Sequence, residues 1–455
     1  MTEHHPIQQT NTGRHFAYRQ LADLREDLDR LAIQLPIQED LTILAQHLSI
    51  GSGSSPNRLA IHPMEGCDGT AEGSPSDLTR RRYQRFAAGG AGLLWVEATA
   101  VVPEGRANPR QLWLHQANIG DFRDMLAEID QLAPHRPYKV LQLTHSGRYA
   151  KPGATPLPQV AVANPYLDRP GQTLTVLTDE QLDGLVPHYV AAARLARQAG
   201  FDAVDIKACH RYLISELLSA YTRPGRYGGS LENRTRLLLN IVRAIRSEVE
   251  IDLAIRMNAY DEIPYPFGWG VDRDDFRKPD LQETVWLLHE LVREGVVLVD
   301  VTGGNPYYNP HVNRPYDQGP YQPPEHQLVH AAKLLGAART LKAAEPSVRI
   351  IATGLSWFRQ FGGPLAAGLI HEQWCDLAGF GRQAFAYPDF AADMLTGQGM
   401  VGAKCCIACS KCSEIMRDGG MSGCVIKDRE PYLAIYQAGR AGKDPIASNR
   451  EAEHV

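Results

Sequence analysis

The chain has 455 residues, of which 44% are hydrophobic and 22% are charged, and its formal net charge is −5. This composition is close to that of average globular proteins and excludes disordered and fibrous classes. Charges of both signs alternate without long blocks, which argues against a nucleic-acid or membrane-surface partner. We therefore expect one large domain with appendages, acting on a small molecule.

Targeting signals are absent from the pattern. No apolar run approaches the roughly 20 residues that a membrane span needs, and the polar start MTEHHPIQQTNTGRH lacks the apolar core of a secretion signal. Five of the eight cysteines fall between Cys405 and Cys424, which is typical of metal ligation in a reducing compartment. We expect a cytoplasmic protein.

Residues 1–50 are predicted to form a helical extension. Leucines at positions 21, 24, 28, 31 and 35 recur at helical spacing in a charged stretch that ends at Pro36. The resulting amphipathic helix either covers the main domain or makes a contact in a homo-oligomer. The following segment GSGSSPN, residues 51–57, is predicted to be a linker.

From residue 58 onward, eight short β-rich runs alternate with helical patterns. The runs span residues 58–64, 91–97, 138–145, 201–207, 251–257, 296–302, 348–354 and 374–382. This alternation predicts a parallel sheet, and eight units predict closure into a (β/α)8 TIM barrel over residues 51–399. One intervening helix is delimited by a capping box of Thr178 and Gln181 and by Gly200.

Polar or special residues recur where these strands end: His62, Glu97, Gln142, His145, Lys207, His210, Arg256, Thr302, Gly354 and Arg382. In TIM-barrel enzymes that face carries the active site. A doubly wound sheet is the alternative fold, but it would scatter these residues, and the chain lacks a G-x-G-x-x-G turn.

Residues 400–430 form a cysteine-rich segment, followed by a C-terminal tail at 431–455. Cys406, Cys409, Cys412 and Cys424 give the pattern C-x2-C-x2-C-x11-C, with Cys405 as a spare thiol. Three closely spaced thiolates and a fourth after a glycine-rich turn favour a 4Fe-4S cluster, with zinc as the alternative. The other cysteines lie in or beside strands and are expected to be small buried side chains: Cys67, Cys209 and Cys375.

Several ordered motifs resemble the old yellow enzyme family, in particular its iron-sulfur branch, which includes 2,4-dienoyl-CoA reductase and trimethylamine dehydrogenase. The motifs are NRLAIHPM, GLLWVEATAVVPEGR, LQLTHSGR, CHRYLISELLSAYTRPGRYGGSLENR, IRMNAYD, ATG and FGR. The likeness runs from about Asn57 to Lys427, and the joint order of the motifs is specific. It implies a TIM barrel that binds FMN at the carboxyl ends of its strands.

The resemblance also assigns residues to the flavin ring. The backbone of Pro63 and Met64 would lie beside the isoalloxazine, with Ala98 close to it. Gln142 would hydrogen-bond the pyrimidine edge. Arg256 would lie near N1 and the C2 carbonyl, where a cation stabilises the reduced anionic flavin. A surface ion pair is the alternative role for Arg256.

The phosphate end of FMN is predicted from the last two strands. Gly354 follows the seventh strand, and Gly381 with Arg382 follows the eighth. These positions offer open backbone N–H groups and a guanidinium in the two loops where barrels commonly bind phosphate.

By the same resemblance the catalytic residues are Lys207, His210 and Tyr212 in the sequence KACHRY. Lys207 and His210 would bind the carbonyl or nitro oxygen of the substrate. This contact polarises a conjugated double bond so that flavin N5 can deliver hydride to the β carbon. Tyr212 would protonate the α carbon, because a phenol can donate without being ionised at neutral pH.

Two residues depart from the family pattern. Lys207 stands where relatives commonly have histidine, which favours an anionic substrate unless Lys207 pairs with an acid such as Asp205 or Glu65. Glu65 stands beside the flavin where relatives tend to have Thr or Cys. Its carboxylate would disfavour the reduced anionic flavin and so lower the redox potential.

The leading functional hypothesis is reduction of an enone, enoate or enoyl thioester. One alternative is an amine dehydrogenase or demethylase of the trimethylamine dehydrogenase type, in which Tyr307 and Tyr308 contribute to an aromatic bowl for a cation. A third is a non-catalytic electron-transfer subunit holding zinc. Because no dinucleotide-binding domain follows the cysteines, we expect a separate electron-transfer protein or subunit, or direct reduction of FMN by NAD(P)H.

Overall fold

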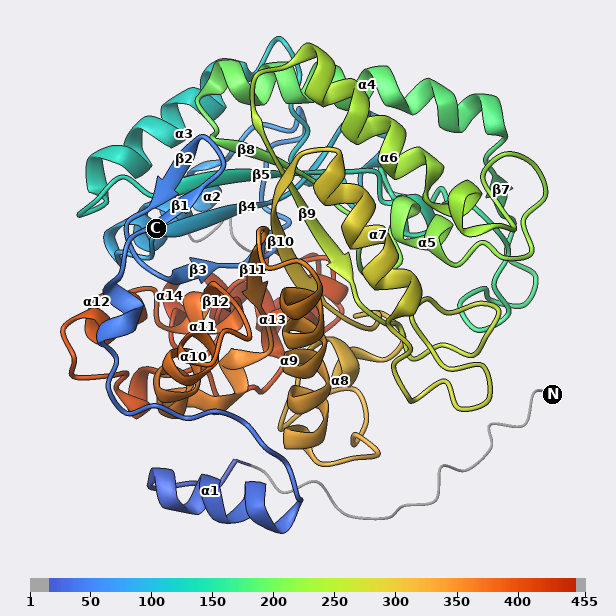
Figure 1. Cartoon of the computed structure of the whole chain (residues 1–455). Helices are drawn as coiled ribbons and strands as arrows, with labels where there is room; N and C mark the ends of the chain where they lie inside the picture. Colours follow the sequence, from blue (N-terminus) through green and yellow to red (C-terminus); the bar gives the residue numbers. More distant parts are fainter. Residues whose placement is uncertain (1–15, 447–455) are drawn as a thin grey trace.

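A computed structural model describes residues 16–446. Eight parallel strands form a closed barrel in the order β10-β11-β12-β3-β4-β5-β8-β9 (Figure 1). Their bounds are β3 (Leu59–Ile61), β4 (Leu93–Ala100), β5 (Tyr138–Thr144), β8 (Ala203–Ile206), β9 (Asp252–Asn258), β10 (Val296–Thr302), β11 (Arg349–Ala352) and β12 (Leu377–Phe380). All eight lie within or across the predicted runs, so the (β/α)8 barrel is confirmed.

Helices between the strands surround the barrel, and their apolar faces form the main core with the outward side chains of the strands. They are α2 (Asp77–Ala88), α3 (Ile119–Leu132), α4 (Asp179–Ala199), α5 (Leu213–Leu218), α6 (Leu231–Glu248), α7 (Gln282–Arg293), α8 (Pro310–Asn313), α9 (Gln327–Ala344), α10 (Gly362–His371), α11 (Arg382–Ala386) and α12 (Phe390–Leu395). Helix α4 has the predicted boundaries, because Thr178 and Gln181 form the capping box and Gly200 ends it at φ 108°.

Short elements occupy the connections. They are η1 (Thr42–Ala45), η2 (Pro103–Gly105), η3 (Gly147–Tyr149), η4 (Leu355–Phe361) and the parallel pair β6 (Gln159–Val160) and β7 (Thr175–Val176). Of these, η4 follows β11 and helps to shape the carboxyl end of the barrel.

The N-terminal helix α1 (Leu21–Arg30) is shorter than the leucine repeat predicts. The chain leaves the helix at Ala32, which takes a left-handed conformation with φ 52°. Leu24 and Leu28 are buried in the main core, so α1 covers the barrel, one of its two expected roles.

The predicted linker at 51–57 is instead part of a β-hairpin. Strands β1 (Leu48–Ile50) and β2 (Gly53–Ser55) pair antiparallel. The backbone N–H of Ser52 donates to the Asp252 carboxylate, 2.9 Å away, at the start of β9. Leu48 and Ile50 pack against inward-facing residues of the barrel strands, so the hairpin plugs the amino-terminal end of the barrel.

The cysteine-rich segment continues into ordered helices. It carries η5 (Gly402–Lys404) and α13 (Lys411–Arg417), and α14 (Arg429–Arg440) follows. Ile415 of α13 packs with Tyr432 and Ile435 of α14. Most of α14 falls in the predicted tail, whose last residues, 447–455, lie outside the described part of the chain.

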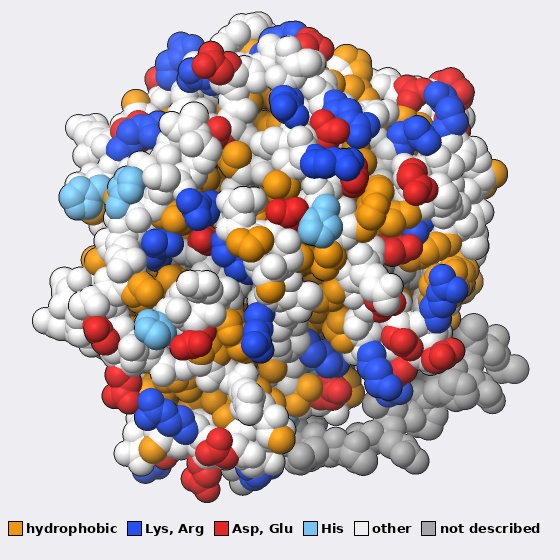
Figure 2. Space-filling view, in the orientation of Figure 1, with side chains coloured by type: hydrophobic (Ala, Val, Ile, Leu, Met, Phe, Trp, Pro, Cys, Tyr) orange, Lys and Arg blue, Asp and Glu red, His pale blue; other side chains and the backbone are white. Residues whose placement is uncertain are grey.

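On the face of the molecule that Figure 2 shows, acidic and basic side chains are interspersed. Within residues 16–446, no helix is both long and apolar enough to cross a membrane.

Candidate active site at the carboxyl end of the barrel

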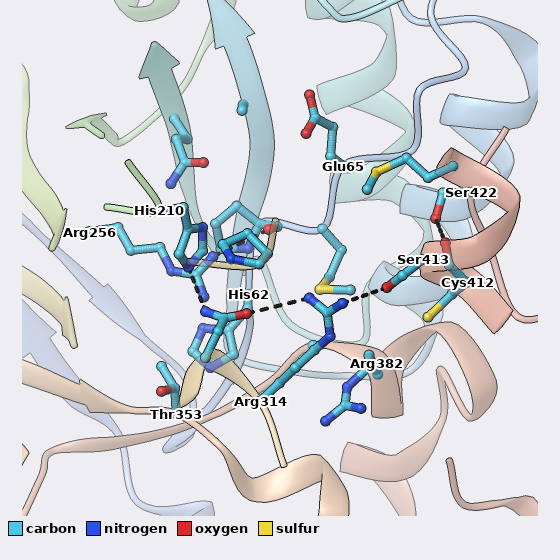
Figure 3. A pocket seen from close by; sticks show the side chains of 18 of the residues that line it. His62, Glu65, His210, Arg256, Arg314, Thr353, Arg382, Cys412, Ser413 and Ser422 are labelled. Atoms are coloured by element: carbon cyan, nitrogen blue, oxygen red, sulfur yellow. Dashed lines mark hydrogen bonds between the residues drawn. The ribbon is translucent and has the colours of Figure 1, made fainter. Parts of the chain in front are cut away.

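One cavity at the carboxyl ends of the strands brings together all twelve barrel residues that the sequence assigns to flavin binding or catalysis (Figure 3). They are Pro63, Met64, Glu65, Ala98, Gln142, Lys207, His210, Tyr212, Arg256, Gly354, Gly381 and Arg382. The cysteine segment closes one side of the cavity through Cys412, Ser413 and Ser422. The roles of these residues stay predictions.

Gln142 is held in one orientation at the end of β5. Its Nε2 donates to Asp205 Oδ2, 2.6 Å away. Asp205 also accepts from the backbone N–H of Arg256 at 2.7 Å and from Trp95 Nε1 at 3.0 Å. Burial raises the pKa of the Asp205 carboxyl to about 7. With its amide nitrogen engaged, Gln142 has its carbonyl oxygen left to accept a hydrogen bond from a ligand.

Arg256 forms a buried ion pair, so the surface ion pair considered from the sequence is wrong. Its side chain is 9% exposed, and its Nε lies 2.9 Å from Asp300 Oδ2. The same carboxylate oxygen lies 2.9 Å from His62 Nδ1. His62 Nε2 is buried without a hydrogen-bond partner among the described residues. Asp300 therefore fixes both side chains at the cavity floor.

The loops after β11 and β12 form an open set of donors. Gly354 caps η4 with φ 92°, a conformation that favours glycine. A Cβ at Gly381 would lie 2.7 Å from Met64 Sδ, so a larger residue here would displace the Met64 side chain. Arg382 donates from Nη2 to the carbonyl of Pro315 at 2.6 Å, whereas its Nη1 is buried without a partner in the described chain. This end of the cavity is suited to an anion.

Arg314 directly follows α8 in the connection after β10 and lines the same end of the cavity. Sequence reasoning missed this residue. Figure 3 shows it extending across the cavity, where its Nη2 donates to Ser413 Oγ at 2.8 Å. Burial and the nearby charge of Arg382 lower the pKa of Arg314 to about 10. None of the described acids forms an ion pair with it. Its only sequence context is N-R-P in a loop, where no periodicity or spacing marks an arginine as a ligand.

A strained turn presents the residues of KACHRY. His210 and Arg211 have φ of 62° and 61°, which is uncommon for residues other than glycine. Arg211 is fully buried and anchors the turn by pairing with Asp261 at 3.0 Å. The backbone N–H of His210 donates to Asn258 Oδ1 at 3.1 Å. Such strain is characteristic of functional sites.

His210 is neutral in this setting. Its Nε2 accepts from Asn313 Nδ2 at 2.7 Å, which leaves the ring proton on Nδ1. Burial, together with the charges of Arg256 and Lys207, lowers the His210 pKa well below its usual range. His210 can therefore donate one hydrogen bond from Nδ1.

Lys207 lies against Tyr212, with its Nζ 3.6 Å from the centre of the phenol ring. Burial lowers the Lys207 pKa. Neither alternative ion pair occurs, because Asp205 is occupied by Gln142 and Arg256, and Glu65 contacts Tyr212. Lys207 thus lies beside the cavity without an ion pair in the described chain, although the charges of Glu65 and Asp205 act on it from a greater distance.

The Tyr212 hydroxyl donates to Glu65 Oε2 at 3.2 Å and lies 3.2 Å from the Tyr307 hydroxyl. Tyr307 in turn stacks on Tyr149, with ring centroids 4.0 Å apart. Tyr307 lines the cavity, whereas Tyr308 does not. Tyr212 and Tyr307 therefore line the cavity, and Tyr149 stacks behind Tyr307 outside the lining. We call these three rings the aromatic wall, and only Tyr307 of the predicted pair belongs to it.

Three of the polar strand-end residues do not line the cavity. The register of β4 shifts between Val96 and Thr99, and the Glu97 carboxylate accepts from the backbone N–H of Gly66 at 2.6 Å. Glu97 also pairs with Arg82, so it holds the loop that carries Glu65. The other two, His145 and Thr302, bond to neighbouring loop residues.

Cys406, Cys409, Cys412 and Cys424 line one small hollow beside the cavity. Backbone N–H groups donate to two of the sulfurs, from Ala408 to Cys406 at 3.4 Å and from Lys427 to Cys424 at 3.3 Å. Within residues 16–446, no group of three or more His, Cys, Asp or Glu is arranged to hold a metal ion. Four thiols with backbone N–H donors to two of them have the chemistry of cluster ligands, although their present positions do not form a metal-binding group.

The sequence profile of the NADH:flavin oxidoreductase / NADH oxidase family matches residues 44–265. The NADPH dehydrogenase of Halalkalibacterium halodurans is 30% identical over 253 residues, which cover 54% of this chain and 69% of that protein. The solved structure of a 2-naphthoyl-CoA reductase complex has a TM-score of 0.71 at 21% identity and covers 86% of this chain. Histamine dehydrogenase from Rhizobium sp. 4-9 has a TM-score of 0.66 at 19% identity and covers 85%. This chain spans 57% and 52% of those two structures.

The barrel and the donors at its carboxyl end are those of an oxidoreductase of the flavoprotein class. The chain belongs to the NADH:flavin oxidoreductase / NADH oxidase family, the old yellow enzyme family to which its motifs point.

Proposed function

We propose that this protein binds FMN in the cavity and reduces a carbon–carbon double bond conjugated to a carbonyl or carboxylate. The observation that carries the proposal is the convergence of Lys207, His210 and Tyr212 on a cavity whose far end is an open set of anion donors. Bound FMN would supply hydride from N5. The protein would bind and polarise the substrate and supply its proton.

The lining of the cavity offers contacts for both ends of FMN. Gly354, Gly381 and Arg382 would hold the phosphate, with Arg314 as a second cation. The free oxygen of Gln142 would accept from the pyrimidine edge, and Arg256 would stabilise negative charge on the reduced ring. The buried and unpartnered Nη1 of Arg382 supports this placement.

Arg382→Met is expected to weaken FMN binding about tenfold to a hundredfold, since a hydrogen bond to a charged group contributes roughly 1.5–3 kcal/mol. The matched control is Arg349→Met, because Arg349 pairs with Asp376 at the opposite end of β11. Titration of the apoprotein with FMN, followed by flavin fluorescence, measures both. Equal affinity in the two variants would contradict the phosphate site.

Lys207 favours a carboxylate-bearing substrate. A buried cation without an acid partner is costly, and an anionic group on the substrate offsets that cost. Lys207 and the Nδ1–H of His210 would both donate to this group and withdraw charge from the double bond. Among the three substrate types expected from the sequence, this arrangement favours the enoate.

Lys207→His is expected to lower kcat/KM for an enoate by about tenfold to a hundredfold relative to a neutral enone of the same skeleton, because one charge-assisted contact is lost. In the wild type the preference for the enoate should fade as pH rises, since the lowered Lys207 pKa means that its charge is lost earlier than usual. Steady-state rates with the matched pair test both points. An unchanged ratio would show that Lys207 does not contact the anion.

The four cysteines in the hollow would hold a 4Fe-4S cluster beside the flavin, since Cys412 lines both spaces. Such a cluster passes single electrons, and we expect a separate electron-transfer protein or subunit to exchange them. NAD(P)H remains the alternative electron donor, reaching the flavin directly.

Amine oxidation is the second candidate. It is favoured by the stacked pair of Tyr149 and Tyr307 in the aromatic wall, because such rings attract cationic amines. The charge of Lys207, close to Tyr212, would repel the same ligand. Because Lys207 would repel a cationic amine, reduction of a double bond is the preferred proposal.

The deciding experiment begins with anaerobic photoreduction of the flavin. Enones, enoates and enoyl thioesters are then added in turn while the spectrum of oxidised flavin is recorded. Rapid return of that spectrum, fastest with an enoate, is the expected result. If no unsaturated substrate reoxidises the flavin and N-methylated amines reduce the oxidised enzyme, the amine dehydrogenase is correct.

A further inference from the structure

Glu65 is buried beside Tyr212, and only one of its two carboxyl oxygens has a hydrogen-bond partner among the described residues. An effect on the flavin potential alone does not require this arrangement. Glu65 Oε2 accepts from the Tyr212 hydroxyl at 3.2 Å, and Glu65 Oε1 is buried without a hydrogen-bond partner among the described residues. An ionised carboxylate in this position would leave a charged oxygen unsatisfied, which is costly. A protonated carboxyl carries no charge, so a missing hydrogen bond costs less, and its O–H group can itself donate a hydrogen bond.

The groups that face Glu65 act in opposite directions. Burial raises its pKa, whereas the charge of Lys207 and the hydrogen bond of Tyr212 oppose the increase. The polar neighbours Tyr307 and Cys67 and the acid Glu97 also lie close enough to interact with it. The net direction is upward, so the proton stays on Glu65 at higher pH than on an ordinary glutamate.

Protonation of Glu65 reverses the hydrogen bond with Tyr212. The carboxyl O–H then donates to the phenol oxygen, and the phenol proton is released from Glu65. That proton can point into the cavity, where Lys207 and His210 also face. A protonated Glu65 also lacks the charge on which a lowered flavin potential depends.

We propose that Glu65 is the positioning and proton-supplying partner of Tyr212 in the reduction proposed above, on which this inference rests. The Tyr212 O–H bond breaks as a C–H bond forms at the α carbon, while hydride from reduced FMN reaches the β carbon. The phenolate takes the proton of the Glu65 carboxyl, since a carboxyl is ordinarily a stronger acid than a phenol.

Tyr307 provides the return path for the proton. Its hydroxyl lies within 3.2 Å of the Tyr212 hydroxyl, and its side chain is 39% exposed. After the product leaves, a proton from solvent water passes through Tyr307 and Tyr212 to the Glu65 carboxylate. The three side chains thus form a chain from the reacting carbon to the surface.

The test compares wild type, Glu65→Gln, Tyr212→Phe and the double variant in single-turnover reoxidation of reduced flavin across neutral and alkaline pH. Glu65→Gln keeps a donor to the phenol oxygen but has no proton to give. We expect roughly a tenfold loss of rate at neutral pH, part of the full effect of a general acid. The wild-type rate should fall as pH rises through the raised Glu65 pKa. This part of the fall should be absent in Glu65→Gln, whereas the fall caused by the loss of the Lys207 charge should remain in both proteins.

The double variant should be no slower than Tyr212→Phe, because Glu65 acts only through Tyr212. Glu262→Gln is the matched control, since Glu262 is a buried acid that pairs with Lys333 outside the cavity. It should keep the wild-type rate and pH profile. An additive loss in the double variant would overturn the inference, as would an unchanged pH profile in Glu65→Gln.

Infrared difference spectra of the FMN-loaded protein without substrate give a second readout. One carbonyl band of a protonated carboxyl should be present at neutral pH in the wild type and missing in Glu65→Gln, whereas the band of buried Asp205, whose pKa is about 7, should remain in both. Absence of the Glu65 band from the wild type would overturn the inference while leaving the proposed reduction intact. If the Glu65 band is present but no unsaturated substrate reoxidises the flavin, the proposed function has failed and the inference falls with it.

Discussion

Tyr212→Phe is expected to slow reoxidation of the reduced flavin by an unsaturated substrate about 10²–10⁴-fold, the usual contribution of a general acid. The reason is that Tyr212 is the one phenol within hydrogen-bond distance of both Glu65 and Tyr307 among the described residues, beside both anion donors. Its pKa is raised by burial, so it stays protonated at neutral pH. FMN content should not change, because Tyr212 lies away from the phosphate end.

Stopped-flow spectroscopy of the reduced protein gives this rate directly. Tyr149→Phe is the matched control, since Tyr149 belongs to the same aromatic wall but its hydroxyl accepts from Asn305 at 2.7 Å, away from the donors. This control should keep most of the activity. A wild-type rate in Tyr212→Phe would show that the proton comes from another group.

Cys409→Ala is expected to abolish the iron-sulfur cluster. Cys409 lies in the hollow with the other three proposed ligands, and three thiolates hold a cubane cluster poorly. Iron and sulfide analysis of the anaerobically purified variant, together with its visible spectrum, measures the loss. The flavin should remain, because its predicted contacts lie on the barrel.

Cys405→Ser serves as the matched control within the same segment. Cys405 is buried and donates to the carbonyl of Val401 at 3.5 Å, outside the set of four. Iron content should stay at the wild-type level. Iron loss in Cys405→Ser with retention in Cys409→Ala would reassign the ligands, and zinc in place of iron in the wild type would overturn the cluster.

The barrel could be predicted because β-rich runs and amphipathic helices alternate, and each is recognised from the hydrophobic periodicity of a short stretch of sequence. The carboxyl-end residues followed from the same pattern, since side chains just after parallel strands meet at one face. Motif resemblance then separated cavity residues such as Gln142 from strand-end residues such as Glu97. Periodicity alone could not make that distinction, because a register shift in β4 lies between Val96 and Thr99.

Features that depend on contacts between residues distant in the sequence could not be predicted. Arg314 comes from an irregular loop, and only the folded chain places it beside Arg382 and Ser413. The segment at 51–57 has the composition of a linker, yet the distant Asp252 fixes it as a hairpin. Whether Lys207 forms an ion pair could not be predicted for the same reason. Its possible acid partners, Asp205 and Glu65, bind residues that are far away in the sequence.

The proposed function depends above all on FMN in the cavity with an iron-sulfur cluster beside it. The most direct test is the flavin, iron and sulfide content of the anaerobically purified protein. We predict one FMN per chain with about four irons, as for a single cubane cluster. A protein that contains no flavin and does not take up FMN on reconstitution would contradict the proposed function.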